Sequence, residues 1–401
     1  MIISAHLPMP LWETKEQFVA TAIISADSHV LEPGNLWQQR LDRKYRDRAP
    51  RIFQDTSTGK YKFGGEGVPA VFYSGLFAVD KRGEELAVHN AGPASEKDVP
   101  PGGWNPQRRL LDQDVDGVSA EVLYASLAFP MFRVNDRDYQ KALFRVYNDW
   151  LTEFCSVAPQ RLIGMALIPL IDVQDGVREL RRAHKNGLRG GMIFASPPPG
   201  RPFTSRIYDP FWRVAEELSM PIGLHILTGH GAPSRRMLAE QGPIEFLTGL
   251  MGLSDEVVYS LTDIVFSGVL ERFPGLKIIS AENEVGWIPF WLHMADQWWG
   301  RYRASQANEL TMLPSDYYKR QVFATFLEDP IGVHCAQLPL VGYDNLMWGN
   351  DYPHGSSTWP NSRKVIDHIM TGVSPANRRK MLSDNCARLY GIELPRSGRA
   401  K

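Results

Sequence analysis

From residue 119 onward, short apolar runs alternate with longer segments whose apolar residues recur at helical spacing. Runs of this length fit buried strands, and the longer segments fit amphipathic helices. Together with the opening run and a helical segment after residue 104, the pattern predicts eight strands and eight helices. The predicted strands lie within 22–33, 119–126, 161–170, 188–196, 221–226, 276–282, 321–328 and 346–354. Beyond the second strand, the predicted helices lie within 138–159, 172–187, 209–220, 254–275, 286–302, 330–339 and 363–373.

This unbroken alternation predicts an α/β fold, a closed (β/α)8 TIM barrel. The strands are continuous apolar runs instead of alternating ones, as expected when both faces of a parallel sheet are covered by other elements. An open, doubly wound parallel sheet is the competing topology, because it also alternates strands and helices.

The chain divides into an expected N-terminal extension at 1–21, the barrel at 22–391 and a C-terminal tail at 392–401. Residues 33–104 interrupt the barrel pattern with a stretch rich in Gly, Pro and aromatic residues, such as "KYKFGGEGVPAVFYSG". This insertion lies between the first strand and its helix, so we expect it to lie as a lid over the C-terminal face of the barrel. A poorly ordered surface insertion is the alternative.

Candidate chemistry is concentrated where the predicted strands end, which is where barrel enzymes place their active sites. The first strand ends at Asp27 and His29, which are two residues apart and therefore point to the same side of a strand. The fifth strand, "PIGLHILTGH", provides His225, with His230 in the loop beyond. The sixth strand ends in carboxylates, with Glu282 foremost.

The eighth strand, "LMWGNDYPH", adds Asp351 and His354 to this set. Imidazole and carboxylate groups together suit Zn, Fe or Mn, because Ca and Mg sites are built from oxygen alone. The sequence therefore predicts a site for a divalent transition metal, holding either one ion or a dinuclear pair. The candidate metal ligands are Asp27, His29, His225, Asp351, Glu282 and His354, and the candidate catalytic residues are Asp351, Glu282 and His230.

Composition narrows the classes of partner. The 401 residues are 43% hydrophobic and 22% charged, and the net charge is -1, so there is no basic surplus for nucleic acid or an anionic membrane. A small-molecule substrate is expected. The three cysteines form no CxxC pair, and no apolar window reaches the length of a membrane span, which together predict a cytoplasmic protein.

Some residues near these motifs have plainer explanations. Glu32 follows the first strand closely and precedes Pro33, where a loop acid is commoner than a ligand. Arg108 and Arg109 could meet a substrate carboxylate, but a solvated helix face explains them as well. The segment "GWIPFWLHMADQWWGRYR" holds four tryptophans, which favour packing in the core or at a subunit interface over a pocket wall. Because this segment and the insertion offer more apolar surface than a monomer exposes, we expect a homodimer.

The motifs "SADSHVLEP", "GLHI", "PGLKIISAENEVGW", "WGNDYPH" and "NCARLYG" together resemble the amidohydrolase-related TIM-barrel enzymes, in their amidohydrolase 2 branch. Members of this metal-dependent family include hydrolases and nonoxidative decarboxylases of aromatic or dicarboxylic acids. The resemblance implies that Asp27, His29 and His225 bind metal and that Asp351 corresponds to the family's aspartate at the end of the eighth strand. It covers the chain from about residue 22 to 391.

The sixth strand departs from the family pattern. Many members have a His followed by glycines there, whereas this chain has Glu282, Asn283 and Glu284. A carboxylate is negative unless burial protonates it, but it can bind or bridge metal ions.

Three activities follow. The leading expectation is a metal-dependent hydrolase, in which Asp351 acts as general base on a metal-activated water that attacks a carbonyl-type substrate. The alternatives are a nonheme diiron monooxygenase of bulky acyl substrates, with Glu282 as a ligand, and a nonoxidative decarboxylase; the resemblance extends to both kinds of enzyme. A barrel that only binds its ligand is a further class, but it should have lost some of these ligands.

Overall fold

The structure, a computed structural model, describes residues 22–56, 59–73, 99–231, 243–305 and 309–394. The predicted N-terminal extension, residues 74–98 of the insertion and residues 395–401 of the tail lie outside these ranges.

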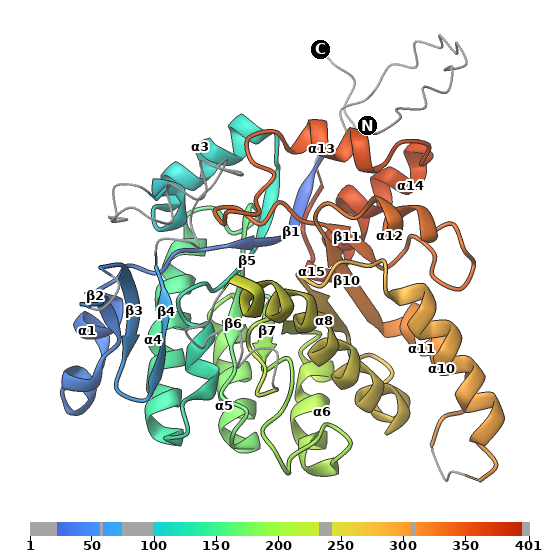
Figure 1. Ribbon diagram of the computed structural model, residues 1–401, viewed down its shortest axis with the longest axis horizontal. Coiled ribbons are helices and arrows are strands. Elements are labelled where there is room, and N and C mark those ends of the chain that lie inside the picture. Colours follow the sequence, from blue (N-terminus) through green and yellow to red (C-terminus); the bar gives the residue numbers. More distant parts are fainter. Residues whose placement is uncertain (1–21, 57–58, 74–98, 232–242, 306–308, 395–401) are drawn as a thin grey trace.

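Eight parallel strands form one sheet in which each strand pairs with the next one along the chain (Figure 1). Two backbone hydrogen bonds connect the first strand of this sheet to the segment after the last one. Asp351 N–H donates to Asp27 O at 2.9 Å, and His29 N–H donates to Tyr352 O at 2.7 Å. The predicted barrel is therefore confirmed, and the order lacks the reversal of a doubly wound sheet. The strands are β1 (Ile24–His29), β5 (Ala120–Tyr124), β6 (Leu162–Leu167), β7 (Gly190–Ile193), β8 (Ile222–His225), β9 (Ile278–Ala281), β10 (Val322–Phe326) and β11 (Leu346–Trp348).

A helix follows every strand of the barrel, and the helices cover its outside (Figure 1). Helix α5 is an amphipathic example, which buries Leu180 and Ala183 and exposes charged residues on its other face. The eight are α3 (Pro106–Asp116), α4 (Arg137–Ser156), α5 (Val173–Lys185), α6 (Asp209–Glu217), α8 (Pro243–Phe266), α10 (Ile288–Tyr302), α12 (Pro330–Cys335) and α13 (Ser362–Ile369). Shorter elements are η4 (Phe129–Arg133), η5 (Arg206–Tyr208), α9 (Val269–Arg272), α11 (Pro314–Gln321), α14 (Pro375–Arg379), the π-helix η6 (Lys380–Asp384) and α15 (Asn385–Tyr390).

Two helices differ from the sequence pattern. Helix α8 begins at Pro243, well before the predicted start at residue 254, and it ends at Phe266 because Gly268 turns the chain with a φ of 73° before α9. Helix α11 was not predicted, because its sequence "PSDYYKRQ" is short and mostly polar. Both errors concern helices outside the barrel sheet, so they leave the strand order unchanged.

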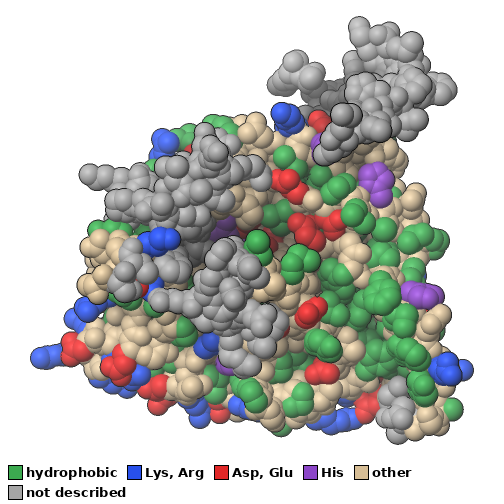
Figure 2. Space-filling view, in the orientation of Figure 1, with side chains coloured by type: hydrophobic (Ala, Val, Ile, Leu, Met, Phe, Trp, Pro, Cys, Tyr) green, Lys and Arg blue, Asp and Glu red, His purple; other side chains and the backbone are tan. Residues whose placement is uncertain are grey.

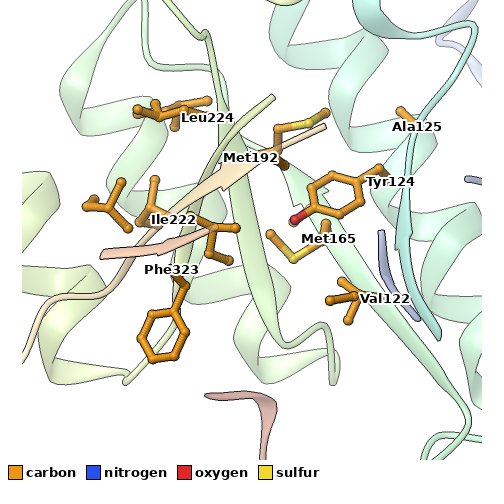
Figure 3. Packing of buried hydrophobic residues seen from close by; sticks show 14 of the residues in the cluster. Val122, Tyr124, Ala125, Met165, Met192, Ile222, Leu224 and Phe323 are labelled. Atoms are coloured by element: carbon orange, nitrogen blue, oxygen red, sulfur yellow. The ribbon is translucent and has the colours of Figure 1, made fainter. Parts of the chain in front are cut away.

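The interior of the barrel is filled by large side chains from neighbouring strands (Figure 3). Met165, Met192 and Tyr124 are fully buried there, and Phe323 is nearly so. Because this interior is packed, the space for a ligand lies above it, at the carboxyl ends of the strands.

The described part of the insertion forms its own small unit beside α4 (Figure 1). It contains α1 (Leu36–Arg40), η1 (Arg43–Arg48), η3 (Pro101–Gly103) and an antiparallel sheet of β2 (Arg51–Gln54), β3 (Tyr61–Gly65) and β4 (Val68–Phe72). Trp37 anchors this unit by donating its indole N–H to Leu143 O of α4 at 3.0 Å. The lid itself stays a prediction. Among the described helices, none is both long enough and apolar enough to cross a bilayer.

Candidate metal centre

The predicted site residues lie on or just after four strands, β1, β8, β9 and β11, all at the carboxyl end of the barrel. Asp27 and His29 lie on β1, His225 ends β8, and Glu282 comes directly after β9. A β-bulge interrupts the pairing of β1 with β5 between Ser25 and Ser28, yet Asp27 Oδ1 and His29 Nε2 lie only 3.6 Å apart. Asp27, His29 and His225 are fully buried, while the Glu282 side chain keeps 19% exposure.

One oxygen of Asp27 is fixed by hydrogen bonds and the other is not. The Thr325 hydroxyl donates to Oδ2 at 2.6 Å, and the backbone N–H of Glu282 donates to the same oxygen at 2.8 Å. Gly349 lies against Asp27, and a Cβ there would come within 2.6 Å of the Asp27 Cβ. These contacts hold the carboxylate in one orientation, with Oδ1 directed at the two histidines.

Each histidine is oriented by the nitrogen that faces away from this centre. His29 Nδ1 lies 2.7 Å from Ala125 O, and His225 Nδ1 lies 3.0 Å from Ile226 O. A carbonyl only accepts, so both Nδ1 atoms are donors and each Nε2 points its lone pair inward when the ring is neutral. This orientation by an outer carbonyl is typical of histidines that bind metal.

Four buried atoms converge without a hydrogen-bond partner among the described residues: Asp27 Oδ1, His29 Nε2, His225 Nε2 and Glu282 Oε2. Glu282 Oε2 lies 3.2 Å from both Nε2 atoms, and all four atoms lie within 4.8 Å of one another. Buried polar groups without partners are costly, so four of them facing one point indicate a binding site for a cation. Two nitrogens and two oxygens fit a divalent transition metal.

The pKa values of the two histidines move in opposite directions. Burial lowers the pKa of His29 to about 3, so this imidazole is neutral and able to bind metal. Burial also lowers the pKa of His225, but the carboxylates of Asp27 and Glu282 outweigh it and raise the pKa to about 10. The carboxylates of Asp27 and Glu282 therefore stabilise a positive charge at the centre. That charge can be a proton on His225 or a metal ion.

Asp351 and His354 form a second group beside these atoms. Asp351 Oδ1 lies 3.2 Å from His29 Nε2 and 2.8 Å from His354 Nδ1. His354 Nε2 lies 2.9 Å from the Ser126 hydroxyl, which in turn donates to Val30 O at 2.8 Å. Burial lowers the pKa of His354, but Asp351 and Glu282 outweigh it and raise the pKa above its ordinary value.

This second group can also be drawn as a metal cluster, because ligand atoms of His29, Glu282, Asp351 and His354 lie within 4.8 Å of one another. Both ring nitrogens of His354 are already hydrogen-bonded, however, so neither offers an unused lone pair. The structure does not bring His230 into either cluster of the described residues; its ring lies 5.6 Å from that of Phe194.

Strained backbone marks the same strand ends. Glu282 and Asp351 each have a φ of 52°, and Glu284 has a φ of 47°. Residues other than glycine rarely adopt this left-handed conformation, and each instance costs about 1–3 kcal/mol. Glu284 turns away from the centre, with its carboxylate accepting the N–H groups of Leu327 and Glu328.

Three charged residues near the centre have roles that the sequence did not indicate. Glu32 is fully buried and accepts the N–H groups of residues 126–128 at 2.9–3.3 Å, so the expected loop acid instead fixes the loop after β5. Burial raises the pKa of Glu32 to about 7. Arg109 is also fully buried, which contradicts the solvated helix face, and it pairs with Glu121 at 2.5 Å. One feature of the sequence could have indicated this buried ion pair: Glu121 is a lone acidic residue in an otherwise apolar strand.

A sequence profile of the amidohydrolase family matches residues 88–392. The chain belongs to the amidohydrolase family. The resemblance seen in the motifs is thereby confirmed, together with membership of a family of enzymes.

Known relatives of this chain are decarboxylases by name. It is 25% identical over 340 residues to the gamma-resorcylate decarboxylase of Rhizobium sp. (strain MTP-10005), a match that covers 77% of this chain and 98% of that one. The predicted hydrolase and monooxygenase activities find no support among such relatives, which agree better with the decarboxylase alternative.

Solved structures share the fold. An amidohydrolase from Mycobacterium avium subsp. paratuberculosis K-10 superposes with a TM-score of 0.76 at 18% identity, covering 94% of this chain and 99% of that one. A 5-carboxyvanillate decarboxylase from Novosphingobium aromaticivorans DSM 12444, complexed with manganese and 4-hydroxy-3-methoxy-5-nitrobenzoic acid, gives 0.66 at 20% identity, covering 94% and 98%.

Proposed function

We propose that this member of the amidohydrolase family is a metal-dependent, nonoxidative decarboxylase of a small aromatic carboxylic acid. The observation that carries the proposal is the hydrogen-bonded pair of Asp351 and His354 beside four buried ligand atoms that have no hydrogen-bond partner in the described part of the chain. Such a site suits a reaction in which a cation binds the substrate anion and an acid donates a proton to one carbon of the substrate. The named activity of the gamma-resorcylate decarboxylase, which this chain covers almost completely, favours decarboxylation over hydrolysis.

Asp27, His29, His225 and Glu282 would hold the ion, for which manganese is the first choice because a structural relative binds it. When bound, a divalent cation supplies a positive charge that anchors the substrate anion and withdraws electron density from it. The residues themselves exclude water, since three of these four side chains are fully buried. Phe129 adds an apolar wall, with its ring 4.7 Å from that of His225.

Asp351 would carry the proton. The bond between the ring carbon and the carboxylate breaks, its electron pair stays on the carbon, and CO2 leaves. Asp351 then donates a proton to that carbon, and His354 at 2.8 Å can return a proton to Asp351. The step is balanced without water, oxygen or a reductant.

The test is turnover of a panel of hydroxybenzoic acids by the manganese-loaded protein in D2O under anaerobic conditions. We expect CO2 in the headspace and one deuterium at the vacated ring carbon of the product. The Asp351→Asn variant should lose about 100-fold or more of this turnover, because its amide cannot donate an acidic proton, and should still bind metal. Asp367→Asn, an exposed aspartate of α13, is the matched control and should behave as the parent.

Two other results would contradict the proposal. A product that incorporates an oxygen atom from labelled water without CO2 release would identify a hydrolase. Turnover that requires O2 and two irons per chain would identify the monooxygenase.

A further inference from the structure

A cavity of about 480 Å³ lies at the amino end of the barrel strands. Its lining includes residues that directly precede strands, with Lys277 before β9 and Asn345 before β11. The strands are parallel, and the candidate metal ligands lie at their carboxyl ends. The cavity therefore lies at the other end of the barrel and is separate from the candidate metal centre.

Four basic side chains line this cavity: Lys277, Lys319, Arg320 and Arg388. We call it the basic cavity. Among the described residues, Asp344 is the one acid of the lining, and its carboxylate already lies 2.6 Å from Lys380 Nζ, outside the lining. None of the four basic side chains forms an ion pair with a carboxylate in the part of the chain that the structure describes.

This local charge contrasts with the rest of the chain. The sequence has 44 Lys and Arg against 45 Asp and Glu, so no overall surplus of basic residues brings these cations together. On the face shown in Figure 2, Lys and Arg along the lower edge lie among Asp and Glu. Arg181, for example, pairs with Glu217 at 2.9 Å. Four cations around one cavity therefore need a specific explanation.

The ends of helices explain some of these cations but not all. Lys319 and Arg320 lie in the last turn of α11 and Arg388 in that of α15, where a positive charge is favourable. Lys277 instead precedes a strand and is half-buried. Burial lowers the pKa of Lys277, and the charges of Arg320 and Arg388 lower it further. This ammonium group is therefore held where its charge is unfavourable unless an anion lies beside it.

The two guanidinium groups are held in place by contacts that leave donors for a ligand. Arg320 donates from Nε to Gln321 Oε1 and from Nη2 to Leu270 O, both at 2.7 Å. Arg388 donates from Nη2 to Asp344 O at 2.5 Å. Neither Nη1 group forms a hydrogen bond with the described residues. The planar N–H groups of a guanidinium fit the oxygens of a phosphate group.

Part of the lining is apolar and suits the body of an organic molecule. Met220, Phe323 and Leu389 contribute to it, and the Phe323 ring lies 5.8 Å from the Arg388 guanidinium. The volume of the cavity is within the range of about 300–1,000 Å³ that is usual for small-molecule sites. An inorganic ion alone would leave most of this space unfilled.

We propose that the basic cavity binds a small organic phosphate, at a site separate from the metal centre. A phosphate monoester carries about 1.5–2 negative charges at pH 7 and three acceptor oxygens, so it matches four cations better than a carboxylate does. The site does not depend on the proposed decarboxylase activity. The barrel nevertheless connects the two sites, because Phe323 lies two residues before Thr325, whose hydroxyl donates to Asp27.

The first test is calorimetric titration of the metal-free, full-length protein with adenosine diphosphate, pyrophosphate and citrate at one ionic strength. We expect one adenosine diphosphate to bind per chain, more tightly than pyrophosphate, because pyrophosphate has no organic body to contact Phe323. Citrate, an organic anion without phosphate, should bind more weakly than either. The measurement involves no turnover, so its outcome is independent of the proposed activity.

Neutral variants test which residues bind the anion. Lys277→Met and Arg388→Met should each weaken adenosine diphosphate binding about tenfold or more, because each change removes a charged donor. Asp344→Asn should strengthen binding, because it removes the acid of the lining. Lys185→Met, at an exposed lysine of α5, is the matched control and should bind as the parent does. Circular dichroism and melting verify that each variant is folded.

The metal centre is the other place where an anion could bind, so His225→Ala is titrated as well and should bind adenosine diphosphate as the parent does. Loss of binding in this variant would overturn the proposal in favour of the metal centre. The proposal also fails if the parent shows no saturable binding of adenosine diphosphate, or if folded Lys277→Met and Arg388→Met bind it as the parent does. Tighter binding of pyrophosphate than of adenosine diphosphate would overturn it in favour of an inorganic anion.

Discussion

At the scale of single residues, the metal centre depends on charges that do not reach solvent. Arg109 donates to His29 O at 2.7 Å, pairs with Glu121, and lies over the ring of Tyr352 at 4.5 Å. His29 is a candidate ligand, and Tyr352 follows Asp351 directly in the chain. Arg109 therefore fixes the backbone on both sides of the centre. It is a positioning residue, since it contacts no candidate ligand atom.

Removing this guanidinium should be costly. Arg109→Met leaves the buried Glu121 carboxylate without its cation and should lower the free energy of unfolding by about 3–5 kcal/mol. Adding Glu121→Gln should recover part of this loss, because no buried charge then stays unpaired. Denaturant unfolding of the metal-free protein measures both effects.

The exposed pair of Arg40 and Glu153, which is joined by two hydrogen bonds, provides the matched control. Arg40→Met should cost less than about 1 kcal/mol, as surface ion pairs do. Equal costs for the two arginine variants would contradict the role assigned to Arg109.

The sequence could predict which residues converge but not what orients them. Asp27, His29, His225 and Glu282 all lie where an apolar run ends, and parallel strands bring such ends together. Thr325, Ser126 and Arg109 could not be found in this way. Their hydrogen bonds join residues far apart in the chain, and nothing in their local sequence indicates a partner.

At the scale of elements, the ends of β9 and β11 have a left-handed backbone. Glu282, Glu284 and Asp351 occupy conformations that favour glycine, although none of them is glycine. The sequence gives no hint of this, because left-handed positions are predicted from Gly or Asn. The conformation places the carboxylates of Glu282 and Asp351 next to His29.

Glu282→Gly should therefore separate stability from metal binding. Glycine relieves the left-handed strain and removes a buried carboxylate, so the metal-free variant should be as stable as the parent or up to about 1 kcal/mol more stable. Its affinity for manganese should fall, because one of four ligand atoms is lost. Denaturant unfolding and metal titration measure the two quantities.

Ser219 offers the control. It is exposed after α6 with a φ of 52°, so Ser219→Gly should stabilise the protein by about 0.5–1 kcal/mol without changing metal affinity. A Glu282→Gly variant that loses several kcal/mol, or that binds manganese as the parent does, would contradict the role of Glu282 as a ligand under strain.

At the scale of the whole molecule, the barrel was predictable and its outer elements were less so. Every strand of the barrel was expected, because buried parallel strands are apolar runs that the chain must repeat. The early start of α8 and the existence of α11 were not expected. The first turns of α8 and the whole of α11 contain Pro, Gly, Ser or Asp, which are also common in loops. Of the tryptophans in α10, Trp291 and Trp299 are buried while Trp298 is exposed, which only the three-dimensional packing decides.

The account's central claim is that Asp27, His29, His225 and Glu282 hold one divalent ion. The most direct measurement is titration of the metal-free, full-length protein with Mn²⁺, in which the electron paramagnetic resonance signal of the free ion is lost on binding. We predict one ion per chain, with affinity more than about tenfold weaker in His225→Ala and unchanged in His184→Ala, an exposed histidine of α5. No uptake of the ion, or equal affinity in His225→Ala and the parent, would contradict the claim.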